Sequence, residues 1–209
     1  MEKELERYLR EHSTPEGEVL AALYRETQTS MARPRMASGW LQGGFLRLIC
    51  RLISARRVLE IGTFTGYSAI AMASGLEEGG VVHTIDKDDE IEDFTRQYIE
   101  RSGLSRRIIF HVGDALQVIP TLQETFDLVF IDAEKREYPE YYRLALEKTR
   151  AGGVIIADDA LWDEKVLNTS RQDTRTTGIR AFNDMVQRDE RVENMLLPLR
   201  HGLMLIWKR

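Results

Sequence analysis

Residues 58–68 are VLEIGTFTGYS, a short apolar run followed at once by a glycine-containing turn. The run over 58–61 has the length and composition of a buried strand, and Ser68 stands where a new helix would begin. Gly62 and Gly66 bracket the turn, and glycine there lets the backbone approach a ligand and leaves free amides at a helix start. The spacing differs from the G-x-G-x-x-G of pyrophosphate binding, which disfavours a nicotinamide dinucleotide. An ordinary strand-to-helix turn is the alternative interpretation.

Short apolar runs continue to alternate with amphipathic segments as far as the C-terminus. They predict further strands at 81–85, 108–112, 128–131 and 154–157. Helices are expected near 67–74, 89–102, 115–121, 138–149 and 178–187. Such alternation implies parallel pairing with right-handed crossovers, and two last runs at 195–199 and 203–207 predict an antiparallel hairpin at the sheet edge. The predicted fold class is therefore α/β, with a mostly parallel central sheet and helices on both faces.

The first third of the chain has a helical pattern instead. Thr14 can cap a helix that starts at 15–16 and runs through Thr27, and residues 43–53 carry apolar side chains at helical spacing. The run of Arg and Asp over 164–180 is expected to be a mobile surface loop or lid. No proline, glycine or serine-rich linker divides the chain, so we expect one domain over 1–209, with a helical cap (1–56) and a sheet core (57–209).

Composition narrows the class of protein. The chain is 43% hydrophobic and 30% charged, which is ordinary for a globular protein and excludes disordered and fibrous classes. A net charge of -5 gives no basic field for nucleic acid, although a local patch at 51–57 is compatible with it. The single cysteine, Cys50, lies in an apolar stretch and fits a buried hydrophobe in a reducing cytoplasm. The sequence contains neither an apolar signal core nor a run of ~18 apolar residues, so we expect neither export nor membrane insertion.

Two apolar runs end abruptly in carboxylates: residues 126–131 stop at Asp132, and residues 154–157 stop at Asp158 and Asp159. The carboxyl ends of parallel strands form the ligand crevice of an open α/β sheet, and neighbouring strands lie about 4.8 Å apart. If these two strands are neighbours, three acids converge, and like charges ~4 Å apart repel by roughly 4 kcal/mol. The cluster therefore needs a bound proton or a cation, and Mg²⁺ is the simplest candidate.

A fourth acid, Asp86, ends the second predicted strand, about 20 residues after Gly66. A carboxylate at that position can accept hydrogen bonds from both hydroxyls of a ribose. As a lone acid it would more often be a solvated loop residue or a helix cap. Together with the glycine turn, it indicates a nucleoside site.

Five segments in order resemble a known family: VLEIGTFTGYS, HTIDKDDE, HVGDALQVIP, FDLVFIDAEK and GGVIIADDALW. They are similar to the metal-dependent S-adenosylmethionine (SAM) O-methyltransferases of the catechol and caffeoyl-coenzyme A type, which include the bacterial family 3 O-methyltransferases. The likeness extends from about Met36 to the C-terminus, and the pairing of IDAEK with IIADDALW is its most specific part. The resemblance implies a Rossmann-like class I methyltransferase fold.

The resemblance also implies roles for individual residues. The methionine half of SAM would be lined by Glu60, Gly62, Thr63, Gly66 and Ser68. The ribose would be bound by Asp86 and the adenine by Gly113, Asp114 and Ala115, and the cofactor would be covered by the region of Met36. The metal, which is Mg²⁺ or another divalent cation such as Mn²⁺ or Ca²⁺, would be held by Asp132, Asp158 and Asp159, of which Asp132 also borders the cofactor. The catalytic lysine would be Lys135.

The chemistry of these residue types agrees with those roles. A hydroxyl coordinated to a carboxylate-bound metal becomes more acidic, and vicinal hydroxyls can chelate the metal. Lys135 can reach the same pocket, where a metal and a sulfonium would lower its pKa and favour a neutral base. The expected reaction is in-line methyl transfer from sulfur to a phenolate-like oxygen. Without this context, a lysine on a solvated turn paired with Glu134 or Glu137 is the more usual interpretation.

Asp159 departs from the family pattern, in which asparagine commonly occupies the third metal position. The extra charge could tighten metal binding, change the preferred metal or leave one carboxyl protonated, and a helix-capping or outward aspartate is the alternative. Trp40 and Trp162 either wall an aromatic acceptor or simply pack, and Asn183 would touch substrate by family analogy only.

Three functions follow from these observations. The first is a cytoplasmic metal-dependent O-methyltransferase acting on a small hydroxylated acceptor such as a catechol or caffeoyl derivative. The second keeps the enzyme class but places the acceptor hydroxyl on a tRNA hydroxyuridine, which the acidic charge balance disfavours without excluding it. The third is a non-catalytic SAM-binding module. The weakly featured N-terminal helices also suggest a homodimer.

Overall fold

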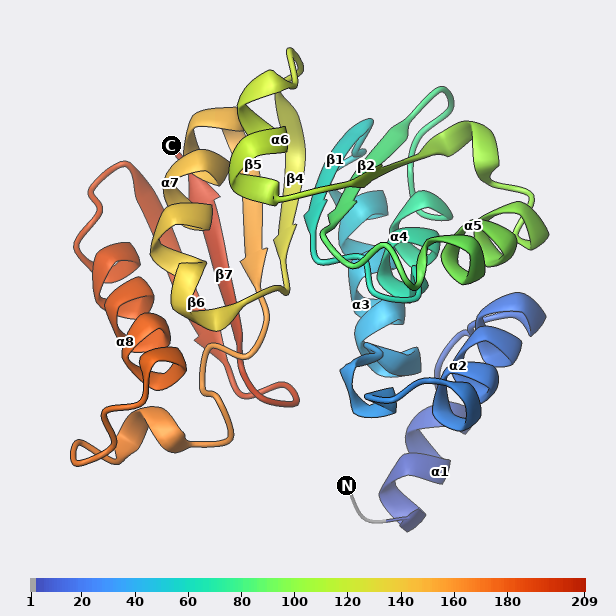
Figure 1. The fold of residues 1–209 in the computed structure, drawn as a ribbon, viewed down its shortest axis with the longest axis horizontal. Helices are drawn as coiled ribbons and strands as arrows, with labels where there is room; N and C mark the ends of the chain where they lie inside the picture. The colour runs from blue at the N-terminus through green and yellow to red at the C-terminus, as the bar shows by residue number, and fades with distance from the viewer. Residues whose placement is uncertain (1–2) are drawn as a thin grey trace.

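The computed structural model describes residues 3–209, which form a seven-stranded sheet in the order β3-β2-β1-β4-β5-β7-β6 (Figure 1). The strands are β1 (Arg57–Ile61), β2 (Val81–Asp86), β3 (Ile108–Val112), β4 (Phe126–Ile131), β5 (Thr149–Ala157), β6 (Val192–Leu197) and β7 (Leu203–Lys208). Strands β1 to β5 pair in parallel, whereas β7 is antiparallel to both β5 and β6. The α/β fold class and the antiparallel C-terminal hairpin at the sheet edge are confirmed.

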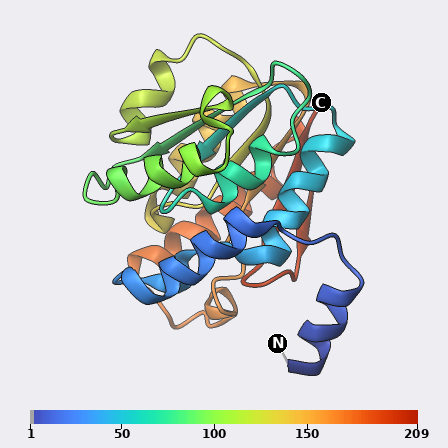
Figure 2. The same cartoon turned by 90° about the vertical axis from the view of Figure 1, so that its right-hand side faces the viewer.

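Helices cover both faces of the sheet (Figures 1 and 2). One face carries α6 (Ala115–Thr121), α7 (Tyr138–Lys148) and α8 (Thr174–Gln187), whose apolar side chains share one core cluster with the strands. The other face carries α2 (Glu18–Ser30), α3 (Gly39–Leu52), α4 (Tyr67–Ala73) and α5 (Glu92–Arg101), which share a second cluster. Outside these lie α1 (Lys3–Glu11) and the short 3-10 turns η1 (Pro34–Met36), η2 (Ser105–Arg107), η3 (Lys135–Glu137) and η4 (Lys165–Leu167).

The central strands explain why the charged residues gather at one end of the sheet. Every residue of β1 after its first is buried, and β4 is buried except at Asp127. Strands covered by helices on both faces must be apolar along nearly their whole length. Polar side chains are therefore accommodated where the strands end, and the register pairs Ile61 with Ile131 and Ile131 with Ala157, so that β1, β4 and β5 end together.

The N-terminal part of the chain is joined to the core by polar contacts, of which the Thr27–Thr65 contact is buried and the other two are partly buried. The hydroxyls of Tyr67 and Tyr98 donate to the carboxylates of Glu16 and Glu26, and Thr27 donates to Thr65 across 3.1 Å. The predicted helix start at 15–16 is wrong, because Gly17 has φ 91° and α2 begins at Glu18. The next helix, α3, begins at Gly39 and not at residue 43.

Three other boundaries are corrected. The segment over 164–180 is not simply a mobile loop: it contains η4, and α8 starts at Thr174 because the Asp173 carboxylate caps it by accepting from Thr176 N at 3.0 Å. β5 begins at Thr149, five residues before the predicted start. β6 spans Val192–Leu197 and stops before Pro198, which has no N–H to continue the ladder.

The prediction that Cys50 is a buried apolar residue is confirmed, since it is fully buried in α3 and burial raises the pKa of its thiol to about 12. Within residues 3–209, none of the helices combines the length and the apolar character that crossing a membrane requires.

Candidate active site

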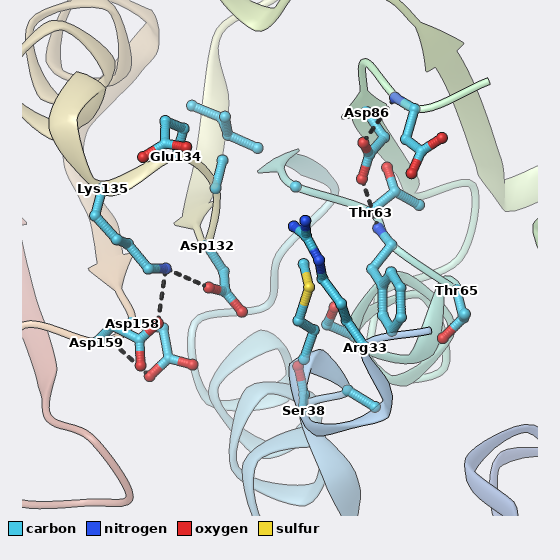
Figure 3. Close-up of a pocket in the computed structure, with 18 of the residues that line it drawn as sticks. Arg33, Ser38, Thr63, Thr65, Asp86, Asp132, Glu134, Lys135, Asp158 and Asp159 are labelled. Atoms are coloured by element: carbon cyan, nitrogen blue, oxygen red, sulfur yellow. Dashed lines mark hydrogen bonds and ion pairs between the residues drawn. The ribbon is translucent and has the colours of Figure 1, made fainter. Parts of the chain in front are cut away.

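A cavity of about 970 Å³ opens at the carboxyl ends of the parallel strands (Figure 3). Its walls are the turns after β1, β2, β3, β4 and β5, the turn between β6 and β7, the segment between α2 and α3, and side chains from α4, α7 and α8. The sequence-predicted residues that line it are Met36, Gly62, Thr63, Ser68, Asp86, Gly113, Asp114, Ala115, Asp132, Lys135, Asp158 and Asp159. Of the residues predicted to bind cofactor or metal, two lie outside the lining: Glu60 is buried within β1, and Gly66 is the N-cap of α4.

The glycine turn after β1 is built for close backbone approach. Gly62 has φ 102°, and a Cβ atom there would lie 2.0 Å from the carbonyl oxygen of Asp132. Only glycine fits, because the turns after β1 and β4 touch at this point. Across the turn, the Asp86 carboxylate accepts from Phe64 N at 2.7 Å and from Asp88 N at 3.1 Å, which fixes its orientation.

Glu60 is a fully buried acid on β1. One carboxylate oxygen accepts from the Thr84 hydroxyl at 2.5 Å, while Oε1 finds no hydrogen-bond partner in the part of the chain that the structure describes. Burial raises the pKa of Glu60 to about 8, against the lowering effect of the nearby hydroxyls of Ser68 and Thr84. Glu60 therefore holds a proton at neutral pH and leaves one buried oxygen unused, which a nearby cation or donor would satisfy.

Lys135 lies at the centre of the acid cluster. Its Nζ is 2.8 Å from Asp132 Oδ1, 2.7 Å from Asp159 Oδ2 and 2.8 Å from the Tyr138 hydroxyl. Burial alone would lower the pKa of Lys135, but the carboxylates outweigh it and hold the pKa well above its ordinary value. In the chain by itself Lys135 is an ammonium, and the neutral base expected from the sequence applies only with cations beside it.

The solvated-turn interpretation of Lys135 is wrong. Its side chain is only 8% exposed, and the two glutamates that could have paired with it have other partners. Glu134 receives two hydrogen bonds from Arg175, at 2.9 and 3.0 Å, and Glu137 accepts from the Tyr141 hydroxyl at 2.5 Å.

The three strand-end acids do converge. Asp158 is 3% exposed, and burial together with repulsion from Asp132 and Asp159 raises its pKa to about 7. Burial also raises the pKa of Asp132, against the lowering effect of Lys135. Asp159 has φ 58°, a strained backbone for a non-glycine residue, and faces Lys135 instead of capping a helix or pointing outward.

Two residues without any sequence signal, Gln42 and Arg200, are linked to Asp158 by hydrogen bonds. The Gln42 amide on α3 donates to Asp158 Oδ2 at 2.7 Å, and Asp159 N donates to Asp158 Oδ1 at 2.8 Å. Arg200, in the turn between β6 and β7, donates to the amide oxygen of Gln42. It also donates to the carbonyl of Ser38, which belongs to the cavity lining and is labelled in Figure 3.

Comparison with known proteins identifies the chemistry of this cavity. The family model described as O-methyltransferase matches residues 10–209. The chain belongs to this O-methyltransferase family. It is 36% identical over 162 residues to a catechol O-methyltransferase of Niastella koreensis, covering 76% of this chain and 73% of that one. It is 34% identical over 209 residues to catechol O-methyltransferase domain-containing protein 1 of Mus musculus, covering 98% and 78% of the two chains.

Solved O-methyltransferases share the whole fold. The enzyme from Bacillus cereus in complex with SAH aligns with a TM-score of 0.92 at 31% identity, covering 98% of this chain and 97% of that one. TomG from Streptomyces achromogenes in complex with SAM aligns with a TM-score of 0.92 at 30% identity, covering 100% and 99%. The family and these cofactor complexes identify this chain as a SAM-dependent O-methyltransferase.

The acids of this O-methyltransferase suit a divalent metal by their chemistry. Two carboxylates share one ammonium and a third, Asp158, lies beside them, and hard oxygen ligands with surplus negative charge are what Mg²⁺ prefers. Within residues 3–209, no three carboxylate, histidine or cysteine side chains are already arranged around one metal position. Lys135 lies between Asp132 and Asp159, so a cation enters only if Nζ moves aside or the carboxylates turn.

Other sequence candidates are placed differently. Trp162 lines the cavity, whereas Trp40 stacks under the Arg10 guanidinium, 4.6 Å from the ring centre, as a packing residue. Asn183 is absent from the lining and donates to the Ala160 carbonyl at 2.8 Å, so its contact with substrate is not supported. Sequence reasoning missed Gln42 and Arg200 because neither lies in a motif, and missed Tyr138, whose only signal was its position three residues after Lys135.

Proposed function

We propose that this O-methyltransferase transfers methyl from SAM to a hydroxyl of a small catechol-like or caffeoyl-like acceptor with the help of a divalent metal. The observation that carries the proposal is that the glycine turn and Asp86 open into the same cavity as Lys135 and the acid cluster. Relatives named catechol O-methyltransferase and caffeoyl-CoA O-methyltransferase support this acceptor class.

On the cofactor side, we assign Asp86 to the ribose, Asp114 and Ala115 to the adenine and the turn at Gly62 to the methionine half. The buried Oε1 of Glu60 suits the positive charge of the methionine end. Residues 1–56 serve as a cap on the single domain 1–209, since the lining includes Met36 from this part.

On the acceptor side, we assign the metal to Asp132, Asp158 and Asp159. When bound, a hard cation there would orient adjacent hydroxyls and make one of them more acidic. Lys135 would be the base: with other positive charges beside its two carboxylates, Nζ would be held as the neutral amine, its ammonium proton having passed to solvent before the acceptor binds, and it would then accept the proton of the acceptor hydroxyl. The buried side chains exclude water, so that alignment with the methyl donor drives the transfer.

The decisive experiment offers labelled SAM with catechol, caffeoyl-CoA, a monophenol and bulk tRNA, each with Mg²⁺, Mn²⁺, Ca²⁺ or EDTA. We expect methyl transfer to catechol and caffeoyl-CoA, which carry adjacent hydroxyls. The transfer should be lost in EDTA and return with added metal. The monophenol, which lacks the second hydroxyl, should accept methyl poorly and so tests the need for two hydroxyls. Undiminished transfer in EDTA contradicts metal dependence. Labelling of tRNA alone supports the hydroxyuridine alternative, and no transfer to any acceptor supports a non-catalytic module.

We also propose that the enzyme is a homodimer. Large apolar side chains are exposed on α3, where Leu48 is 55% and Leu52 70% exposed, and on the C-terminal hairpin, where Met195 is 64% and Trp207 45% exposed. A second copy would remove this apolar surface from water. Light scattering should give twice the chain mass, and a monomeric mass would refute the proposal.

A further inference from the structure

We infer that Gln42 and Arg200 are positioning residues, which hold the Asp158 carboxylate in the orientation that methyl transfer requires. The inference rests on the proposed function and deepens it. Gln42 lies on α3 and Arg200 in the turn between β6 and β7, so two elements far from Asp158 in the sequence meet at this acid.

The Gln42 amide can fix the orientation of Asp158 because its oxygen only accepts hydrogen bonds and its NH₂ group only donates them. It is fully buried, and its Oε1 accepts from Arg200 Nη1 while its Nε2 donates to Asp158 Oδ2 across 2.7 Å. An arginine can only donate, so it fixes which end of the amide carries the oxygen and turns the NH₂ group toward the acid. Arg200 thus acts on Asp158 through Gln42.

The same contacts orient Asp158 without neutralising it. Both of its oxygens accept from neutral donors, Gln42 Nε2 and the backbone N–H of Asp159, so rotation of the carboxylate breaks two hydrogen bonds. By contrast, Asp132 and Asp159 are paired with the Lys135 ammonium. Asp158 is therefore the acid of the cluster that is held in place by hydrogen bonds and without a direct ion pair.

Arg200 also links Asp158 to the cover of the cavity. Its guanidinium donates to the Ser38 carbonyl, and to the Ala37 carbonyl at 3.4 Å, and both residues line the cavity next to Met36. One side chain therefore ties the covering segment, the hairpin turn and the acid cluster together. Loss of Arg200 should loosen the cover as well as Asp158, whereas loss of Gln42 should affect Asp158 alone.

The test compares Gln42→Leu, Arg200→Met and the double variant with wild type. For Gln42→Leu we expect kcat to fall about ten- to hundredfold, as loss of a hydrogen bond to a charged group implies, with the SAM Kd from tryptophan fluorescence within about twofold. The double variant should lose less kcat than the two single losses combined, because the part of the Arg200 effect that reaches Asp158 runs through the Gln42 amide. Gln187→Leu is the matched control: this glutamine also bridges a helix to a strand, through Asn194 at 3.3 Å, but outside the cavity, and its kcat should be unchanged.

Crystal structures of wild type and Gln42→Leu give a second readout that does not need activity. We expect the Asp158 carboxylate to be turned in the variant while the backbone of β5 stays in place. An unchanged Asp158, an unchanged kcat or strictly additive losses in the double variant would overturn the inference. A wild-type enzyme that transfers no methyl to any acceptor defeats the proposed function instead, and the crystal structures still decide whether Gln42 positions Asp158.

Discussion

The two halves of the cavity are constructed in different ways. The half that we assign to SAM, called the cofactor half, consists of the turns after β1 and β2, with Asp86 on the lining and Glu60 buried in β1. It is shaped mainly by backbone, because a glycine touches the next turn and backbone N–H groups orient Asp86. The acid half, made by Asp132, Asp158, Asp159 and Lys135, is shaped by charged side chains that hold one another. The cofactor half is therefore preformed, whereas the acid half can rearrange when its charge balance changes.

The halves share one electrostatic feature. Each contains a deeply buried carboxyl whose pKa is raised chiefly by burial, to about 8 for Glu60 and about 7 for Asp158. Glu60 has an unused oxygen within the described chain, and Asp158 is held by neutral donors. Each half thus favours the arrival of a positive charge, which fits a sulfonium-bearing cofactor on one side and a divalent cation on the other.

Removing Lys135 should give the largest difference between an effect on kcat and an effect on SAM affinity. Lys135→Met should lower kcat by about a thousandfold, because it deletes the proposed base, while SAM affinity stays within a few-fold because the cofactor half is built from other residues. Initial rates and a SAM titration measure the two effects. Lys3→Met, at an exposed lysine on α1, is the control. If SAM binding and kcat collapse together, the division into two halves is wrong.

Gly62→Ala should damage the cofactor half through its backbone. The new Cβ would lie 2.0 Å from the Asp132 carbonyl oxygen, so we expect the free energy of unfolding to fall by roughly 2–4 kcal/mol and SAM binding to be lost. Gly17→Ala is the matched control, because Gly17 also has positive φ, 91°, but nothing lies within 4 Å of its Cβ position. Urea unfolding of both variants separates the clash from the shared conformational strain of ~1 kcal/mol.

The cofactor half was largely predictable from sequence, and the acid half only in part. Strand ends are visible as apolar runs that stop at a charge, and parallel pairing then brings Asp132, Asp158 and Asp159 together. The residues that hydrogen-bond to these acids could not be predicted from the sequence. Gln42 is 116 positions from Asp158 and Arg200 is 158 positions from Gln42, so only the finished fold joins them.

Local signals also failed where a polar segment was mistaken for a loop. The stretch before α8 is rich in Arg and Asp, yet Asp173 caps the helix and Arg180 donates to the carbonyls of Val166 and Arg171 at 2.9 and 2.8 Å. The charge of Lys135 was equally hidden. The sequence around Lys135 does not reveal which charges surround it. A nearby metal would lower the pKa of a lysine, whereas the two carboxylates beside Lys135 raise it.

The difference in the pH dependence of stability between wild type and Glu60→Gln should isolate Glu60, because the other buried acids, such as Asp158, are present in both proteins. Its folded pKa is raised, so the stability contributed by the neutral form is fully present below pH 4.5 and is lost as pH rises through about 8. Relative to Glu60→Gln, wild type without cofactor should lose about 1–3 kcal/mol in unfolding free energy between pH 5 and pH 9. Saturating SAM should weaken this dependence. A constant difference between the two proteins across this range contradicts a buried neutral Glu60.

The smallest effect is expected at the rim of the acid half, where a charge pair meets solvent. The side chain of Arg175 is 53% exposed and that of Glu134 13%, and hydrogen bonds from Arg175 lower the pKa of Glu134 to about 2. The stability from this pair is therefore present above pH 4.5 and lost as pH falls through about 2, and solvent limits it to about 1 kcal/mol or less.

Arg175→Met should thus cost a few tenths of a kcal/mol in urea unfolding at pH 7 and almost nothing near pH 2, with Arg188→Met, at a fully solvated ion pair, as the control. This small loss contrasts with the effect expected at the buried Lys135, where removal of a charge should change activity far more. A loss of several kcal/mol at Arg175 would mean that the rim, and not the buried cluster around Lys135, holds the acid half together.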